Sequence, residues 1–181
     1  MRRVQLFYKD ISDIIGSNGF SVIRLTDAEH ERAICVICDK MMTEQMTIRF
    51  NNLPEHDQML PEVLTSMLLA DGTRNFEIMV YDVVDGQYRT TLLNKRTLTL
   101  RNIRMSDAVL LHFISKIPIY IEEGLMNRQC SPFVPESKGL SIPINTIDTE
   151  HLNQELERAI ENEDYRLASH LHEELKRRVR R

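Results

Sequence analysis

The dipeptide Asp85-Gly86 stands between two strand-like runs of residues, Phe76 to Val84 and Gln87 to Leu93. Asp-Gly is favoured in two-residue hairpin turns because the central positions of such a turn need a positive φ. The spacing therefore predicts a β-hairpin, and it is the strongest hairpin signal in the chain. A further strand is expected over Leu98 to Ile103.

Three more strands are expected before this hairpin, over Val4 to Ile11, Phe20 to Leu25 and Ala33 to Cys38. The segments that connect them are rich in glycine, asparagine and charged residues, which is typical of turns. A short strand over Ile117 to Ile121 follows later in the chain. Its Pro118 indicates a sheet edge or the beginning of a strand, because proline has no N–H for the ladder.

Helices are predicted between these strands. The first runs from Lys40 to Phe50 and carries a stripe at helical spacing, namely Met42, Gln45, Met46 and Arg49. The second starts near Pro61, ends at Asp71-Gly72, and carries on one side Val63, Leu64, Met67 and Leu68. The third opens at Ser106-Asp107 and continues to Ile114. The strands occur in consecutive hairpins with helices inserted between them, and strands and helices do not strictly alternate. This order indicates an α+β fold with a mixed or antiparallel sheet.

Residues 127–149 form a predicted linker, because this stretch has no periodic pattern and contains Pro132, Pro135, Gly139 and Pro143. It separates an α+β domain over residues 1–126 from a C-terminal helical hairpin over residues 150–181. In the hairpin, Asp148 or Thr149 can cap the first helix, and Asn162-Glu163-Asp164 breaks the pattern between the two helices.

Each helix of this hairpin has an apolar stripe. Helices of about twelve residues are marginal in water, so we expect the stripes to dock against a protein partner. The residues expected to dock are Leu152, Leu156, Ile160, Tyr165, Ala168, Leu171 and Leu175. Homo-oligomerisation is also expected, because a two-helix hairpin commonly completes a four-helix arrangement with another copy.

Composition narrows the functional classes. At 181 residues with 42% hydrophobic content, one main domain is expected. No apolar run approaches the roughly 18 residues that span a bilayer, and no export signal opens the chain, so we expect a cytoplasmic protein without a membrane segment. The net charge of −4 means that any DNA or RNA contact would be local.

The run Arg104-Met105-Ser106-Asp107-Ala108-Val109, followed by Ile117-Pro118-Ile119-Tyr120 and Glu122-Glu123, resembles the closing signature of the bifunctional nuclease family. The segment from Glu77 to Tyr88 resembles the hairpin that precedes this signature, and the resemblance covers roughly residues 4 to 126. It implies a protein that binds and hydrolyses DNA and RNA.

The segment from Leu152 to Arg178 resembles the UVR motif of excision-repair proteins. A short leucine-rich helix, an acidic turn and an aromatic-x-x-Ala start of a second helix carry this resemblance, the last at Tyr165 and Ala168. It implies a docking role for the C-terminal hairpin.

Phosphodiester hydrolysis generally needs an activated water and a cation, commonly Mg²⁺ or Mn²⁺ held by carboxylates. Asp107, Glu122 and Glu123 are the candidate metal ligands, and Arg104 with Asp107 are candidate catalytic residues. An alternative interpretation is that Ser106 and Asp107 cap a helix and that Arg104 pairs with a surface acid.

His56 and Asp57 are adjacent in a polar segment and are candidates for a general base beside a metal-binding acid. A solvated loop is the alternative. Cys35 and Cys38 have metal-site spacing, but on a strand two residues three apart face opposite sides, so burial in the core is expected for both. The three cysteines of the chain are expected to be reduced.

Two functional hypotheses follow. One is a nuclease of the bifunctional type with a C-terminal docking hairpin. The other is a non-catalytic adaptor that keeps the scaffold and acts through the UVR-like hairpin; it is favoured by Asn102, which stands where the family signature has an aspartate.

Overall fold

The structure is a computed structural model that describes residues 2–13, 20–51, 53–70, 73–132 and 147–179. The chain divides into two compact units. The first unit comprises residues 1–82 and 88–140, and the second comprises residues 83–87 and 141–181. Most of the expected linker, residues 133–146, and the helix stop at Asp71-Gly72 lie outside the described residues.

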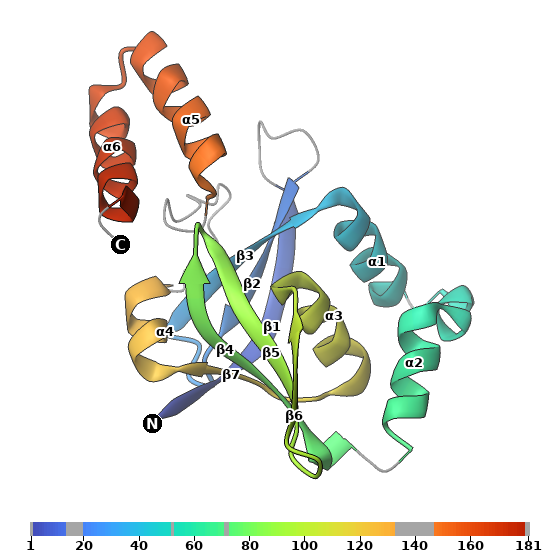
Figure 1. Ribbon diagram of the computed structural model, residues 1–181. Helices are drawn as coiled ribbons and strands as arrows, with labels where there is room; N and C mark the ends of the chain where they lie inside the picture. Colours follow the sequence, from blue (N-terminus) through green and yellow to red (C-terminus); the bar gives the residue numbers. More distant parts are fainter. Residues whose placement is uncertain (1, 14–19, 52, 71–72, 133–146, 180–181) are drawn as a thin grey trace. The chain divides into compact units, whose positions relative to one another are not determined.

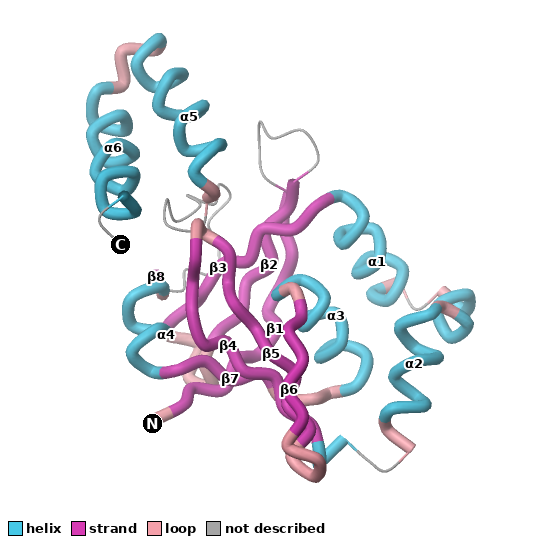
Figure 2. The backbone as a smooth tube through the Cα atoms, viewed as in Figure 1, coloured by secondary structure: helices cyan, strands magenta, loops and turns pink. Residues whose placement is uncertain are grey.

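A mixed sheet organises the first unit, as the α+β prediction requires, and Figures 1 and 2 show its helices and strands. The strand order is β6-β5-β4-β7-β1-β2-β3-β8. The strands are β1 (Arg3–Asp13), β2 (Phe20–Thr26), β3 (Arg32–Asp39), β4 (Phe76–Val84), β5 (Gln87–Asn94), β6 (Thr99–Ile103), β7 (Ile119–Glu122) and β8 (Ser131–Pro132).

The pairing of β4 with β7 is parallel, and it joins the hairpin strands to the N-terminal strands. Its register aligns Ile78 with Ile119 and Val80 with Ile121, and all four side chains are fully buried. Pro118 precedes β7, and its carbonyl accepts a hydrogen bond from the Ile78 N–H at 2.9 Å. Pro118 therefore marks a strand beginning, and the edge interpretation is wrong because β7 is central.

The expected hairpin turn is confirmed. Asp85 and Gly86 both have positive φ, at 52° and 73°, which is the conformation that a two-residue turn between twisted strands requires.

The described residues of the first unit form four helices and two short 3-10 turns, η1 (Pro54–Gln58) and η2 (Thr73–Asn75). The helices are α1 (Lys40–Phe50), α2 (Leu60–Leu68), α3 (Met105–Ser115) and α4 (Glu123–Gln129). Figure 1 shows α1, α2 and α3 gathered on one side of the sheet, with α4 apart from them and next to β7. Both η turns, α4 and β8 were not expected from the sequence.

An aromatic cluster connects α1 and α3 to the sheet. The rings of Tyr8, Phe50 and Phe113 lie with centroids 5.0 to 5.8 Å apart. Asp39 caps α1 by accepting from the Met42 N–H at 2.8 Å, and Met42, Met46 and Arg49 are buried as the predicted stripe requires. Arg49, the last member of this stripe, is charged and is paired with Glu62 of α2.

The second unit contains α5 (Thr149–Glu161) and α6 (Tyr165–Val179). Asp148 caps α5 by accepting from the His151 N–H at 2.9 Å. Leu152, Ala159 and Leu171 are buried in a small core between the two helices, and four partly buried side chains pack against it, namely Ile147, Leu156, Ala168 and Leu175. The two stripes thus cover each other in large part, which corrects the expectation that they need a partner for burial.

Four large apolar side chains of the hairpin lie outside this small core, including Leu167 at 38% exposed. Ile160 is 54% exposed, Tyr165 69% and Val179 88%. Among the described residues, no helix is both long and apolar enough to cross a membrane.

Candidate active site

The start of α3 brings together the two candidate catalytic residues Arg104 and Asp107. Arg104 occupies the cap position, and its Nε and Nη2 donate to Oδ2 and Oδ1 of Asp107 at 2.7 and 3.0 Å. The hydrogen bond and the negative charge of Asp107 raise the pKa of Arg104 above its ordinary value. The pair is solvent-accessible, with the Arg104 side chain 70% exposed and that of Asp107 35% exposed.

The local sequence explains this geometry. Asp107 lies in the first turn of an eleven-residue helix, where an acid is favoured by the helix dipole. The cap of α3 is Arg104 and not the expected Ser106, and the Arg104 side chain makes no capping hydrogen bond. The first N–H groups of a helix have no partner within the helix. An exposed guanidinium beside such groups can bind a phosphate or another anion.

Glu122 and Glu123 lie at another junction, where β7 ends and α4 begins. Glu122 aligns with Arg3 of β1, and the Glu123 N–H donates to the Arg2 carbonyl at 3.1 Å. Within the described part of the chain, no three His, Cys, Asp or Glu side chains are grouped so that they could hold a metal ion. Because both oxygens of Asp107 are also engaged by Arg104, this arrangement does not fit the expected Mg²⁺ or Mn²⁺ site.

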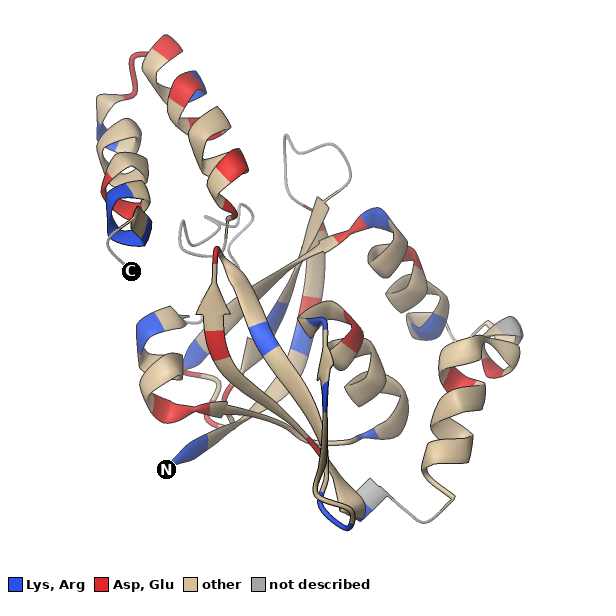
Figure 3. Cartoon of the chain, viewed as in Figure 1, with Lys and Arg blue, Asp and Glu red and all other residues tan. Residues whose placement is uncertain are grey.

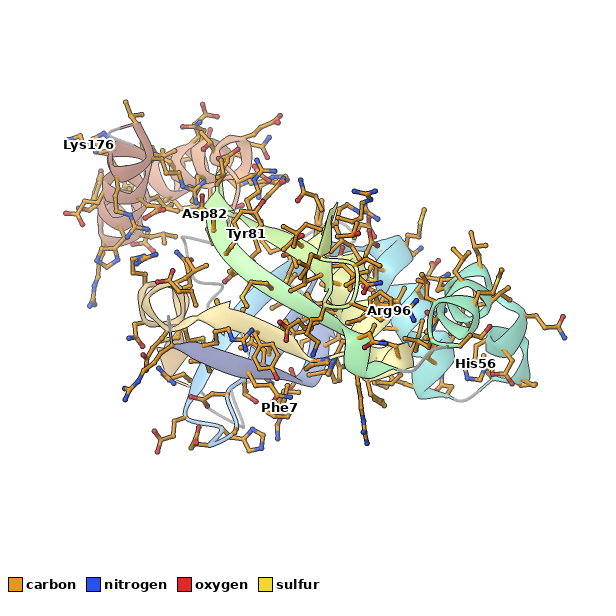
Figure 4. All side chains as sticks on the ribbon, turned by 60° about the horizontal axis from the view of Figure 1, so that its bottom comes forward. Phe7, His56, Tyr81, Asp82, Arg96 and Lys176 are labelled. Carbon is orange, nitrogen blue, oxygen red and sulfur yellow. The ribbon has the colours of Figure 1, made fainter. Side chains whose placement is uncertain are left out.

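His56 and Asp57 lie in η1, the turn that precedes α2, and not in an irregular loop. His56 is labelled in Figure 4. Its Nδ1 is 3.5 Å from Oδ1 of Asp57, and the Asp57 side chain is 79% exposed. Across the described ranges, no hydrogen bond or ion pair joins these two residues to Arg104 or Asp107.

One charged cluster was not anticipated. Glu77 of β4 is 8% exposed, and its carboxylate lies 3.1 Å from Arg3 and 3.8 Å from Lys95. The Arg3 guanidinium also lies 4.8 Å from the centroid of the Tyr120 ring. The sequence signal is a glutamate next to the apolar run Ile78-Met79-Val80, which predicts a buried acid but not the residues that neutralise it.

Cys35 and Cys38 are free and buried, at 3% and 4% exposed. Burial raises the pKa of both thiols to about 11. At neutral pH they are therefore protonated core residues, as the strand argument predicted, and unsuited to metal binding or redox chemistry.

The fold and the α3 start define an α+β domain with a candidate phosphate-binding site. The family model described as the bifunctional nuclease domain matches residues 23–133, and the chain belongs to that family. This agrees with the resemblance carried by the segment from Arg104 to Glu123, and the matched range ends before α5. A search of curated proteins found no match to this chain.

Proposed function

We propose that this protein hydrolyses phosphodiester bonds of DNA and RNA in the cytoplasm, with the reacting phosphate bound at the start of α3. Membership of the bifunctional nuclease domain family supports the reaction class. The observation that supports the location is Arg104, an exposed guanidinium at the first turn of α3 whose orientation is set by Asp107.

Each residue of this pair has a distinct role in the proposal. The Arg104 charge and the first N–H groups of α3 face the phosphate oxygens and stabilise the negative charge that develops on them. Asp107 holds Arg104 in place through two hydrogen bonds. A general base at His56, with Asp57 beside it, stays a prediction, and no step is assigned to it because no contact among the described residues joins it to Arg104. A requirement for Mg²⁺ or Mn²⁺ stays a prediction, and no step is assigned to the ion.

The test is hydrolysis of labelled single-stranded and duplex DNA and RNA by the purified full chain, with Mg²⁺ or Mn²⁺ and with a chelator. Cleavage that is lost in Arg104→Ala, and retained in Arg101→Ala, is the expected result. Arg101 is a suitable control because it is an exposed arginine on the neighbouring strand β6. Intact substrates under all these conditions would reject the nuclease proposal.

A non-catalytic adaptor is the second candidate. Two observations favour it: Asn102 stands where the family signature has an aspartate, and Asp107 is engaged by Arg104. An adaptor would bind nucleic acid or protein without turnover, so the hydrolysis assay separates the two candidates.

The C-terminal hairpin is proposed to dock a protein partner through the apolar side chains outside its own core, chiefly Ile160 and Tyr165. Its UVR-like pattern supports this role. The test is a pull-down with the full chain and with the double variant Ile160→Asp/Tyr165→Asp. Leu152 and Leu171 are poor choices for such a test, because they form the hairpin's core and their substitution would unfold it.

A further inference from the structure

The turn between β4 and β5 belongs to the same compact unit as the C-terminal hairpin, since the second unit comprises residues 83–87 and 141–181. One side chain of this turn, Asp85, contacts both helices of the hairpin. Its Oδ1 accepts from the Thr149 N–H at 3.1 Å, from the Thr149 hydroxyl at 2.5 Å and from Nη1 of Arg178 at 3.2 Å. Asp85 and Arg178 are 93 positions apart in the chain, so this contact is a tertiary one.

The end of the hairpin where α5 begins and α6 ends is suited to a carboxylate. Thr149 is the first residue of α5, so its N–H has no partner within the helix and lies at the positive end of the helix dipole. Arg178 lies in the last turn of α6, and Glu174 orients it by accepting from its Nε at 3.1 Å. In Figure 3, the last turn of α6 is blue and the tip between β4 and β5 is red. A backbone N–H, a hydroxyl and a guanidinium therefore converge on one acid.

Nearby charges do not oppose this contact. Within four positions of its three residues, the chain carries four other acids and five other lysine or arginine residues. Two of these acids are engaged by neighbouring side chains, Glu174 at 2.8 Å from Arg177 and Asp148 at 2.7 Å from His151. The other two, Asp82 and Glu150, are exposed. The Asp85 carboxylate is thus attracted rather than repelled.

The β4–β5 turn does not itself need this carboxylate. Residue 85 must adopt a positive φ, here 52°, and asparagine or glycine meets that requirement as well as aspartate does. The charge of Asp85 is therefore used by the hairpin and not by the turn.

The contact is of a kind that opens reversibly. The Asp85 side chain is 54% exposed, so water and dissolved ions compete for its charge. The core of the hairpin, formed by Leu152, Ala159 and Leu171, does not include the three residues of the contact. The two helices can therefore separate from the turn without losing their own packing.

We propose that Asp85 is a salt-sensitive latch that holds the C-terminal hairpin on the β4–β5 turn and releases it as a folded unit. Ile160 and Tyr165 lie at the other end of the hairpin, where α5 ends and α6 begins, so the latch leaves them accessible to a partner. The latch then decides whether a docked partner is held at the turn. This last consequence rests on the proposed docking role, whereas the latch itself does not.

The first experiment measures the distance between two spin labels in the full chain, placed at Gln87→Cys and Glu173→Cys. Both positions are exposed, and Cys130→Ser leaves only the two buried cysteines besides them. At low salt a narrow distance distribution is expected. Asp85→Gly keeps the turn but removes the carboxylate, and it should broaden the distribution by raising the ratio of released to held hairpins about 2- to 10-fold.

Two neighbouring arginines of α6 supply a matched control. Arg178→Met should broaden the distribution as Asp85→Gly does, whereas Arg177→Met should not, because Arg177 is paired with Glu174. Raising the salt concentration from about 0.05 to 0.5 M should broaden the distribution of the wild type and leave that of Asp85→Gly nearly unchanged.

Three results would overturn the latch. They are a broad distribution in the wild type at low salt, an unchanged distribution in Asp85→Gly, and equal effects of the two arginine substitutions. Circular dichroism measures the helix content of each variant, and a loss of helix in Asp85→Gly would also reject release as a folded unit. None of these readouts depends on nuclease activity or on a docked partner.

Discussion

Arg49 and Glu62 form a buried two-point ion pair that joins α1 to α2, with donor–acceptor distances of 2.6 and 2.7 Å. Arg49 also donates to the Gln45 carbonyl and side chain, at 2.7 and 2.9 Å. The guanidinium is thereby satisfied although its side chain is almost fully buried.

Removing one partner of this pair is expected to be costly. Arg49→Met should lower the free energy of unfolding by about 3–5 kcal/mol, because Glu62 is left with a buried, unpaired charge. The double variant Arg49→Met/Glu62→Leu should lose less than Arg49→Met alone. Chemical denaturation measures the free energy of unfolding of both variants and of the single variant Glu62→Leu. If the loss in the double variant equals the sum of the losses in the two single variants, the pair is not coupled.

At the α3 start, Arg104→Ala is expected to lower kcat/KM for nucleic-acid cleavage by about 10²- to 10³-fold, the usual effect of removing one donor to developing charge. Asp107→Asn should have a smaller effect, because its amide oxygen can still accept one of the two hydrogen bonds from Arg104. Steady-state kinetics compares kcat/KM of the two variants with that of the wild type, and circular dichroism checks that both variants are folded. A larger loss in Asp107→Asn than in Arg104→Ala would give the carboxylate the leading role.

His112 makes the stability of the first unit depend on pH. Burial lowers the pKa of His112 below 6.5, and its Nδ1 lies 2.7 Å from the Ile117 carbonyl. Since the folded pKa is the lower one, the unfolded chain takes up the proton first, and the contribution of neutral His112 is present above pH 6.5. It is lost as pH falls from 6.5 through the folded pKa.

The variant that tests this is His112→Asn, whose side-chain amide can still donate to Ile117. Denaturation curves between pH 7.5 and 5 should show a weaker loss of stability in the variant than in the wild type. Asp27, whose carboxyl pKa is held below 3.8 by hydrogen bonds from Arg32 and Glu31 that outweigh its burial, titrates below this window. If the free energy of unfolding changes equally with pH in the variant and in the wild type, His112 is not the cause of the pH dependence.

The buried thiols predict selective labelling. In the native protein at pH 7.5, a maleimide should modify Cys130 and spare Cys35 and Cys38, because these two are 3% and 4% exposed with pKa values raised to about 11. All three should react in denaturant. Peptide mass spectrometry identifies which cysteines carry the maleimide. Rapid modification of Cys35 in the native protein would contradict its burial.

Several elements were predictable because their signals are local. The helix Lys40–Phe50 and the strand Phe76–Val84 have the expected bounds. The stripe of α1 and the positive φ of Asp85 and Gly86 depend only on residues close in sequence. The contact between Arg104 and Asp107 is of the same kind, since residues three apart at a helix start are neighbours in space.

Other features lacked a local signal. The helix α4 has seven residues, too few to show a helical period, although Leu125 and Met126 are almost fully buried. In the hairpin, the two stripes were visible, but their mutual burial through Leu152 and Leu171 depends on how the two helices meet.

The sequence alone determined most of the helices and strands, but not α4 or β8, together with the hairpin turn and the family signature. Each of these follows from residues that are close to one another in the chain. Only the tertiary structure decided the parallel pairing of β4 with β7, the separation of the acids proposed to bind a metal, and the direction in which α2 faces. These three features depend on which residues Glu62, Ile78 and Asp107 contact after folding, namely Arg49, Ile119 and Arg104. In α2, the buried ion pair outweighs the ordinary preference of an apolar stripe for the core.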